Sequence, residues 1–227
     1  MRAAQYAPLG PAADVLSVVE LDDPQPAPGE VRVRLSFSGV NPTDWKRRSV
    51  GPLAPGPAQI PNHDGAGVID AVGPGADPQR VGERVWVFHA ARNRTAGTAA
   101  TLVCVPSAQA VPLPDHISLE LGASLGIPYI TAHAALTGDG PVAGQTVLVT
   151  GGGGAVGHAA VELGTFLDAD VIATASTPEK AQSAGAAGAR KVLDYRAVDY
   201  LPLLRQAVRS SPTHRRRRIR PCPFGHS

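Results

Sequence analysis

The sequence of 227 residues contains few cysteines, few aromatic residues and no long hydrophobic run. Its two cysteines, Cys104 and Cys222, lie far apart, which argues against a disulfide framework or a cysteine metal cluster and fits a reducing compartment. No stretch approaches the roughly 18 apolar residues that span a bilayer, and residues 1–6 lack the apolar core of a signal peptide. We therefore expect a soluble protein of the cytoplasm, without a membrane segment.

Strong net charge is also lacking, because the formal charge is only +2. Five arginines and no acidic residue fall within residues 211–227, so the rest of the chain carries slightly more negative than positive charge. The arginine cluster has no interleaved aromatic residues and no recognisable nucleic-acid-binding motif. We expect residues 210–227 to form a disordered, solvated basic tail and not a specific nucleic-acid site.

Apolar residues make up 43% of the chain, which is enough for two domains with proper cores. Before residue 117, short segments such as 31–37 and 84–88 alternate apolar and polar residues between turns rich in proline and glycine. This pattern predicts a compact β-rich domain over residues 1–117.

After residue 117 the pattern changes to alternating helices and strands. Such alternation predicts a parallel sheet with helices on its faces, and so an α/β domain over residues 118–209. Ser118 and Thr177 are predicted helix caps, and Gly126-Ile127-Pro128 is expected to interrupt the first helical stretch. The predicted helices are 119–125, 129–136, 155–167 and one beginning after Thr177, and the predicted strands are 146–150, 170–175 and 191–193.

A Gly-rich segment, Gly151-Gly152-Gly153-Gly154-Ala155-Val156-Gly157, joins the first strand of this domain to the next helix. The glycines at 152, 154 and 157 satisfy the pattern G-x-G-x-x-G. Glycine at this place lets a pyrophosphate approach the backbone, and the free N–H groups of the helix start face its charge. We expect Gly151, Gly154, Ala155, Val156 and Gly157 to hold the phosphates of a dinucleotide. The alternative is a merely tight turn.

The end of the second strand of this domain carries no carboxylate that would bind the ribose 2′-hydroxyl of NAD. Instead, Ser176 and Lys180 could meet a 2′-phosphate with a hydroxyl group and a positive charge. The sequence therefore favours NADP over NAD. The alternative interpretation is that Lys180 is a solvated helix lysine beside Glu179.

Four segments of the sequence carry a family resemblance, namely the Gly-rich turn and residues 38–46, 61–69 and 122–132. Together they resemble the medium-chain dehydrogenase/reductase superfamily, in its quinone oxidoreductase or zeta-crystallin branch. The resemblance extends over residues 1–209 and implies a GroES-like domain followed by a Rossmann domain, with the cofactor in the cleft between them.

The resemblance also bears on zinc. In zinc-dependent relatives two catalytic ligands are cysteines, and the matching positions fall near Asn41 and Ile127 here. Only His63, with Asp64 beside it, remains of the ligand set, and one imidazole with one carboxylate makes a poor tetrahedral zinc site. The resemblance therefore implies a zinc-independent protein, in which we interpret His63 as a hydrogen-bonded structural or cleft residue and not as a ligand.

Without zinc, the resemblance implies hydride transfer from NADPH to a quinone or an activated enone. By motif position, Asn41 and Thr131 would approach the nicotinamide half or the pyrophosphate, and Tyr195 would lie by the adenine end. Asn41 could equally cap a turn before Pro42. No residue is assigned a catalytic role.

The resemblance ends near Arg209, so we expect a chain that is C-terminally truncated relative to the family. It would lack the second Rossmann half, the nicotinamide-side wall and the segment that closes the first domain. Relatives often form homodimers through the edge of the Rossmann sheet, but that edge would lie in the missing part. The alternative to an active reductase is a non-catalytic nucleotide-binding remnant or scaffold.

Overall fold

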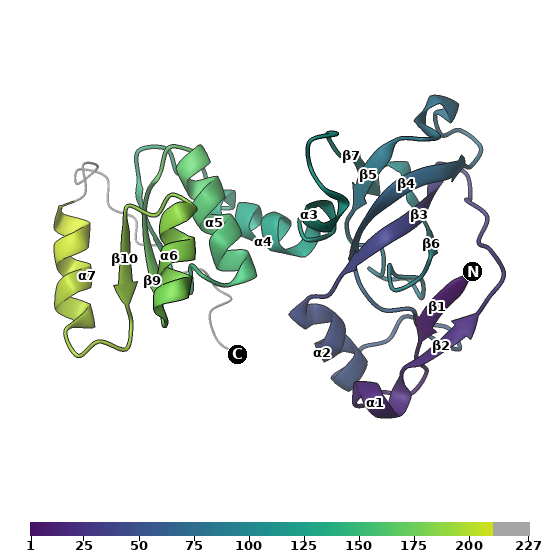
Figure 1. The fold of residues 1–227 in the computed structure, drawn as a ribbon, viewed down its shortest axis with the longest axis horizontal. Coiled ribbons are helices and arrows are strands. Elements are labelled where there is room, and N and C mark those ends of the chain that lie inside the picture. The colour runs from purple at the N-terminus through teal and green to yellow at the C-terminus, as the bar shows by residue number, and fades with distance from the viewer. Residues whose placement is uncertain (211–227) are drawn as a thin grey trace. The chain divides into compact units, whose positions relative to one another are not determined.

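A computed structural model describes residues 1–210 of the chain. The predicted basic tail beyond Ser210, with its arginines and Cys222, lies outside the described residues. By its internal contacts the chain forms two compact units, one comprising Met1–Ile127 and one that begins at Pro128 (Figure 1). Within residues 1–210, no helix combines the length and the apolar character that crossing a bilayer requires.

The first unit is built on a five-stranded antiparallel sheet in the order β6-β3-β4-β5-β7, beside a separate β1-β2 pair. The predicted strands 31–37 and 84–88 lie in β3 and β5, and their inward valines form the core. The β-rich, GroES-like character expected for this part is confirmed. The elements are β1 (Arg2–Gln5), α1 (Ala12–Val15), β2 (Ser17–Glu20), β3 (Glu30–Gly39), α2 (Pro42–Val50), β4 (Asp64–Val72), η1 (Pro78–Arg80), β5 (Arg84–Val87), β6 (Leu102–Pro106), η2 (Ser107–Gln109), β7 (Ala110–Pro112) and α3 (Leu119–Ala123).

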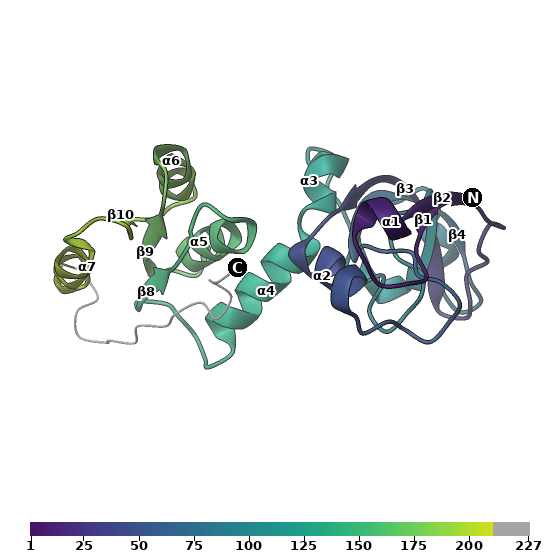
Figure 2. The ribbon, with the colours of Figure 1, turned by 90° about the horizontal axis from the view of Figure 1, so that it is seen from below.

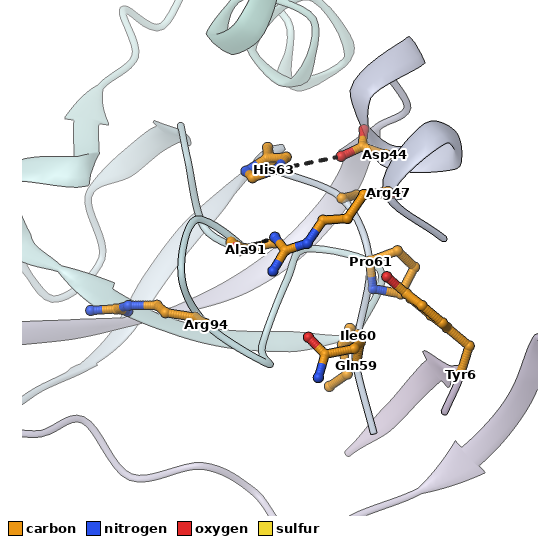
Figure 3. Close-up of a pocket in the computed structure, with 10 residues that line it drawn as sticks. Tyr6, Asp44, Arg47, Gln59, Ile60, Pro61, His63, Ala91 and Arg94 are labelled. Carbon is orange, nitrogen blue, oxygen red and sulfur yellow. Dashed lines mark hydrogen bonds and ion pairs between the residues drawn. The ribbon is translucent and has the colours of Figure 1, made fainter. Parts of the chain in front are cut away.

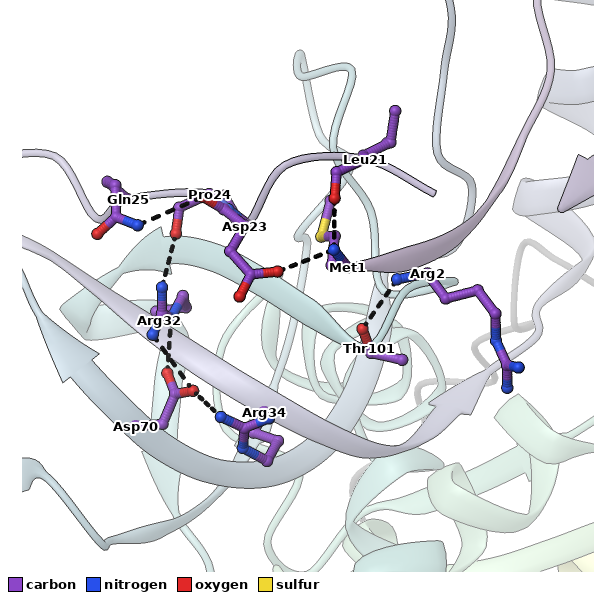
Figure 4. Close-up of polar contacts among 10 residues, drawn as sticks. All are labelled: Met1, Arg2, Leu21, Asp23, Pro24, Gln25, Arg32, Arg34, Asp70 and Thr101. Carbon is purple, nitrogen blue, oxygen red and sulfur yellow. Dashed lines mark hydrogen bonds and ion pairs between the residues drawn. The ribbon is translucent and has the colours of Figure 1, made fainter. Parts of the chain in front are cut away.

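A half-buried ionic cluster fastens the N-terminal segment to this sheet (Figure 4). Asp70 on β4 accepts hydrogen bonds from Arg32 Nε at 2.8 Å and from Arg34 Nη2 at 2.7 Å. Arg32 also donates to the carbonyl oxygen of Pro24 at 3.1 Å. The Met1 amino group forms an ion pair with Asp23, the residue directly before Pro24, at 2.8 Å. Asp70 thus orients the arginine that holds the segment leading into β3.

The substitution Asp70→Ala is expected to lower the free energy of unfolding of the first unit by about 2 kcal/mol, because it leaves Arg32 half-buried without its carboxylate. Urea denaturation followed by tryptophan fluorescence measures this directly, since Trp45 and Trp86 both belong to that unit. The control is Asp115→Ala, because the Asp115 side chain is fully exposed. Equal effects of the two substitutions would contradict the prediction.

The second unit contains a parallel sheet in the order β10-β9-β8, with helices on both faces, as the alternating pattern predicted (Figure 2). Side chains alternate across the sheet. Val147 and Val171 pack on the side of α5 and α6, whereas Leu148 and Ile172 pack on the side of α7. The elements are α4 (Gly126–Thr137), β8 (Thr146–Val149), α5 (Ala155–Phe166), β9 (Asp170–Ala175), α6 (Pro178–Ala186), β10 (Lys191–Asp194) and α7 (Tyr200–Arg209).

Two local features differ from the sequence prediction. The segment Gly126-Ile127-Pro128 does not interrupt a helix, because it forms the first turn of α4. Proline is tolerated there, since the N–H that it lacks would have no intrahelical acceptor. Helix α7 was not predicted, although its apolar residues cover the sheet with helical spacing. By contrast, the predicted cap at Thr177 is confirmed, because its hydroxyl oxygen accepts from Lys180 N at 3.3 Å.

Candidate functional site

The Gly-rich turn connects the carboxyl end of β8 to the start of α5. Gly151 has a φ of 69°, in the left-handed region that favours glycine, and its N–H donates to Thr174 Oγ1 at 3.0 Å. Gly154 is the N-cap of α5, and its N–H donates to the carbonyl oxygen of Gly151 at 2.9 Å. A Cβ atom at Gly157 would lie 2.1 Å from the same oxygen. The turn and the helix start therefore pack as closely as their backbones allow.

The space beside Gly151 and Gly154 is open, since a Cβ atom at Gly151 would meet nothing within 4 Å. A Cβ atom at Gly154 would meet only the carbonyl oxygen of Gly151, at 3.4 Å. The N–H groups of Ala155, Val156 and Gly157 belong to the first turn of α5, where an α-helix offers no internal acceptor. These donors and the positive end of the helix dipole suit an anion.

Three further predicted residues lie near this end of the sheet. Because the strands are parallel, their carboxyl ends share one edge, where Ser176 directly follows β9 and Tyr195 directly follows β10. Lys180 lies in the first turn of α6 and packs on the turn itself, since a Cβ atom at Gly153 would lie 2.5 Å from its Cβ atom. The structure thus brings Ser176, Lys180 and Tyr195 to the edge that carries the turn. Their contacts with a cofactor stay predictions.

Thr131 lies in α4, half-buried. The same helix takes part in a network of polar side chains that the sequence analysis missed. The Tyr129 hydroxyl donates to Glu162, whose carboxylate lies 3.3 Å from His158 Nε2, and His158 Nδ1 lies 3.1 Å from Ser183 Oγ. Burial and the neighbouring Glu162 raise the pKa of Tyr129 to about 12, so its hydroxyl remains a donor. This network of side chains links α4, α5 and α6. In the sequence, only the spacing of four residues between His158 and Glu162 indicates it.

Asn41 lies in the first unit, as the N-cap of α2. Its backbone N–H donates to Asp44 Oδ2 at 2.7 Å, which confirms the interpretation that it caps the turn before Pro42. Its side-chain amide donates to Asp64 Oδ2 at 2.8 Å, and the same oxygen accepts from Ile127 N at 2.7 Å. The predicted approach of Asn41 to the nicotinamide half stays a prediction.

A small pocket adjoins this cluster, between α2 and the segment before β4 (Figure 3). His63 Nε2 lies 3.9 Å from Asp44 Oδ1, which is longer than a hydrogen bond, and His63 Nδ1 has no partner within the described chain. The expected hydrogen bond of the His63 ring is therefore not found among the described residues, whereas its place in the pocket lining agrees with the alternative of a cleft residue. Burial lowers the pKa of His63 to about 4 and raises the pKa of Asp44 to about 6, so the imidazole is neutral at pH 7.

The residues of this cluster do not fit a zinc ion. One carboxylate oxygen of Asp64, the residue next to His63, already accepts hydrogen bonds from the Asn41 amide and from Ile127 N. Neither Asn41 nor Ile127 is a cysteine, so neither position supplies a thiolate ligand. Over residues 1–210, no three His, Cys, Asp or Glu side chains gather as a metal-binding group. A tetrahedral site needs three or four such ligands.

Comparison with known proteins agrees with both halves of the fold. The family of the alcohol dehydrogenase GroES-like domain matches residues 27–115. Human quinone oxidoreductase is 33% identical over 190 residues, which cover 82% of this chain and 56% of that protein. The chain therefore spans little more than half of that relative.

Solved structures extend the likeness over most of this chain. Escherichia coli quinone oxidoreductase complexed with NADPH superposes with a TM-score of 0.76 at 28% identity, covering 91% of this chain and 62% of that one. An NAD-dependent alcohol dehydrogenase superposes with a TM-score of 0.80 at 30% identity, covering 91% of this chain and 67% of that one. The chain belongs to the medium-chain dehydrogenase/reductase superfamily, in its quinone oxidoreductase branch.

Proposed function

We propose that the chain binds NADP(H) at the Gly-rich turn and acts as a zinc-independent reductase of quinones or activated enones. The observation that carries this proposal is the turn itself, whose packed glycines leave the start of α5 open to a pyrophosphate. The human relative is named a quinone oxidoreductase, and the Escherichia coli relative was solved with NADPH. When bound, NADPH would supply the hydride.

The residues of the chain would bind and orient the cofactor. The N–H groups of Ala155, Val156 and Gly157 would hold the pyrophosphate, and Gly151 and Gly154 would give it room. At the same edge of the sheet, the Ser176 hydroxyl and the Lys180 ammonium group would hold the 2′-phosphate, and Tyr195 would lie along the adenine. Asn41 and Thr131 would face the nicotinamide half.

The proposed class of hydride acceptor follows from the poor fit of the first unit to a zinc ion. The cluster of His63, Asp44 and Asp64 is not suited to hold zinc, so an acceptor that is itself electron-poor suits it best. Quinones and enones accept hydride without a Lewis acid when they are well oriented. Steady-state oxidation of NADPH with a panel of quinones and enones tests the proposal. Turnover supports it, whereas binding without turnover favours the alternative of a non-catalytic nucleotide-binding remnant or scaffold.

The preference for NADPH over NADH is expected to depend on Lys180. The substitution Lys180→Ala should weaken NADPH binding about tenfold and leave NADH binding unchanged, because only NADPH carries the 2′-phosphate. The matched control is Lys191→Ala, since Lys191 begins β10 and so lies at the opposite edge of the sheet. Fluorescence titration of the wild type and of both variants with each nucleotide gives the six dissociation constants that are compared. An equal loss for NADPH and NADH would show that Lys180 does not read the phosphate.

A further inference from the structure

Asp64 is a fully buried carboxylate, and the proposed function gives it no role. It is the first residue of β4 and pairs with Gly39 at the end of β3. Its Oδ2 atom accepts from the Asn41 amide at 2.8 Å and from Ile127 N at 2.7 Å. One oxygen atom thus joins the cap of α2 to the second residue of α4.

The bond to Ile127 is special because of its place in α4. The first N–H groups of a helix have no intrahelical acceptor, and Asp64 supplies one at the positive end of the helix dipole. Thr131 follows Ile127 by one turn of the same helix. The carboxylate therefore connects Asn41 to Ile127 in the first turn of α4, and Asn41 is one of the residues predicted to face the nicotinamide half.

The fit around Asp64 leaves little room for another arrangement. A Cβ atom at Gly126 would lie 2.2 Å from Asp64 Oδ1, and one at Gly39 would lie 2.2 Å from the carbonyl oxygen of Ala123. Asp64 Oδ1 itself has no hydrogen-bond partner among the described residues. The ends of β3 and β4 thus meet the start of α4 at backbone contact distance.

Stability does not explain this carboxylate. It lies out of water, no cationic side chain among residues 1–210 pairs with it, and the charged side chain that acts on it, Asp44, is itself acidic. A buried charge of this kind lowers the stability of a fold. Features that cost stability are expected where the geometry they impose is needed.

We propose that Asp64 is a positioning residue, which locks the Asn41 amide to the first turn of α4 and so sets the nicotinamide side of the cofactor site. This inference rests on the proposed function. It assigns Asp64 no contact with cofactor or substrate. Its effect on binding must therefore pass through Asn41.

A double-mutant cycle tests this route. Asp64→Asn is expected to weaken NADPH binding about tenfold in the wild-type background and less than twofold when combined with Asn41→Ala. The control Asp70→Asn makes the same chemical change on the same strand, away from Asn41, and should leave binding unchanged. Additive effects of the two substitutions would overturn the proposal.

Amide hydrogen exchange at Ile127 separates this proposal from the proposed function, because it needs no cofactor. Asp64→Asn should speed exchange at Ile127 about tenfold while Ala132, in the next turn of α4, keeps its protection. Asp64→Glu keeps the charge but moves the carboxylate oxygens, so it should also speed exchange at Ile127. This second variant replaces Asp64→Asn in the experiment if the asparagine variant does not fold. Unchanged exchange at Ile127 would overturn the positioning role. Failure of the wild-type chain to bind NADPH or NADH would instead contradict the proposed function.

Discussion

The substitution Gly157→Ala is expected to weaken NADPH binding at least about a hundredfold, a loss of about 3 kcal/mol. The new methyl group would lie 2.1 Å from the carbonyl oxygen of Gly151 and 3.0 Å from the Cα atom of Gly152. Both neighbours are backbone atoms of a turn that Thr174 holds by hydrogen bonds, so they cannot yield without moving the turn. The N–H groups at the start of α5 would then no longer converge on a phosphate. Fluorescence titration measures the loss.

A matched control uses the same substitution at Gly185, inside α6, where an added Cβ atom meets nothing within 4 Å. Gly185→Ala is expected to leave NADPH binding unchanged and to stabilise the second unit by about 0.5–1 kcal/mol, because alanine favours the helix. Circular dichroism shows whether each variant keeps its helices. If Gly157→Ala stayed folded and bound NADPH as tightly as Gly185→Ala, the turn would not be the phosphate site.

The stability of the first unit is expected to depend on pH through Asp64. Burial raises the pKa of this carboxyl to about 6, whereas the unfolded chain keeps the ordinary value of 3.8. The folded state therefore holds a proton that the unfolded state has already released. The stabilisation is fully present below pH 3.8 and is lost as the pH rises through 6. Two pKa units correspond to about 3 kcal/mol.

Asp64→Asn cannot ionise, so it removes this loss. Relative to the wild type, the free energy of unfolding of the variant should rise by about 2.5 kcal/mol between pH 4 and pH 7.5. Asp44 acts in the same sense, and His63 acts in the opposite sense, since its lowered pKa gives stability that is lost as the pH falls through 4. Asp44 and His63 are present in the wild type and in the variant, so their contributions to the free energy of unfolding largely cancel in the difference between the two proteins. Urea denaturation by tryptophan fluorescence gives the values, and a difference that does not change with pH would contradict the prediction.

The two effects of Asp64→Asn should thus run in opposite directions at neutral pH. The variant gains stability because a buried charge disappears, and it loses NADPH affinity because Asn41 is no longer held. A residue with a merely structural role would not show this combination. A variant that lost both stability and affinity at pH 7.5 would point to a simple packing defect.

The Gly-rich turn and the cap at Thr177 could be predicted from the sequence because each depends on residues within a few positions of one another. The alternation of strands and helices was equally local, and it sufficed for the parallel sheet. Pro128 misled the prediction, since proline stops a helix in its interior but not in its first turn. Helix α7 went unnoticed although its apolar residues repeat with helical spacing.

The polar clusters could not be predicted in this way. Asp64 meets Ile127 across 63 positions, and His158 meets Ser183 across 25. Such pairs depend on how strands and helices pack, which no short pattern records. The sequence drew attention to His63 and Asp64 only as remnants of a metal site. The contact of Asp64 with Asn41 and α4 appears only in the folded chain.

Titration of the wild-type chain with NADPH and with NADH, followed by nucleotide fluorescence, tests the central claim most directly. The account predicts saturable binding of NADPH that is tighter than that of NADH, through the Gly-rich turn and Lys180. Failure to bind either nucleotide would contradict it.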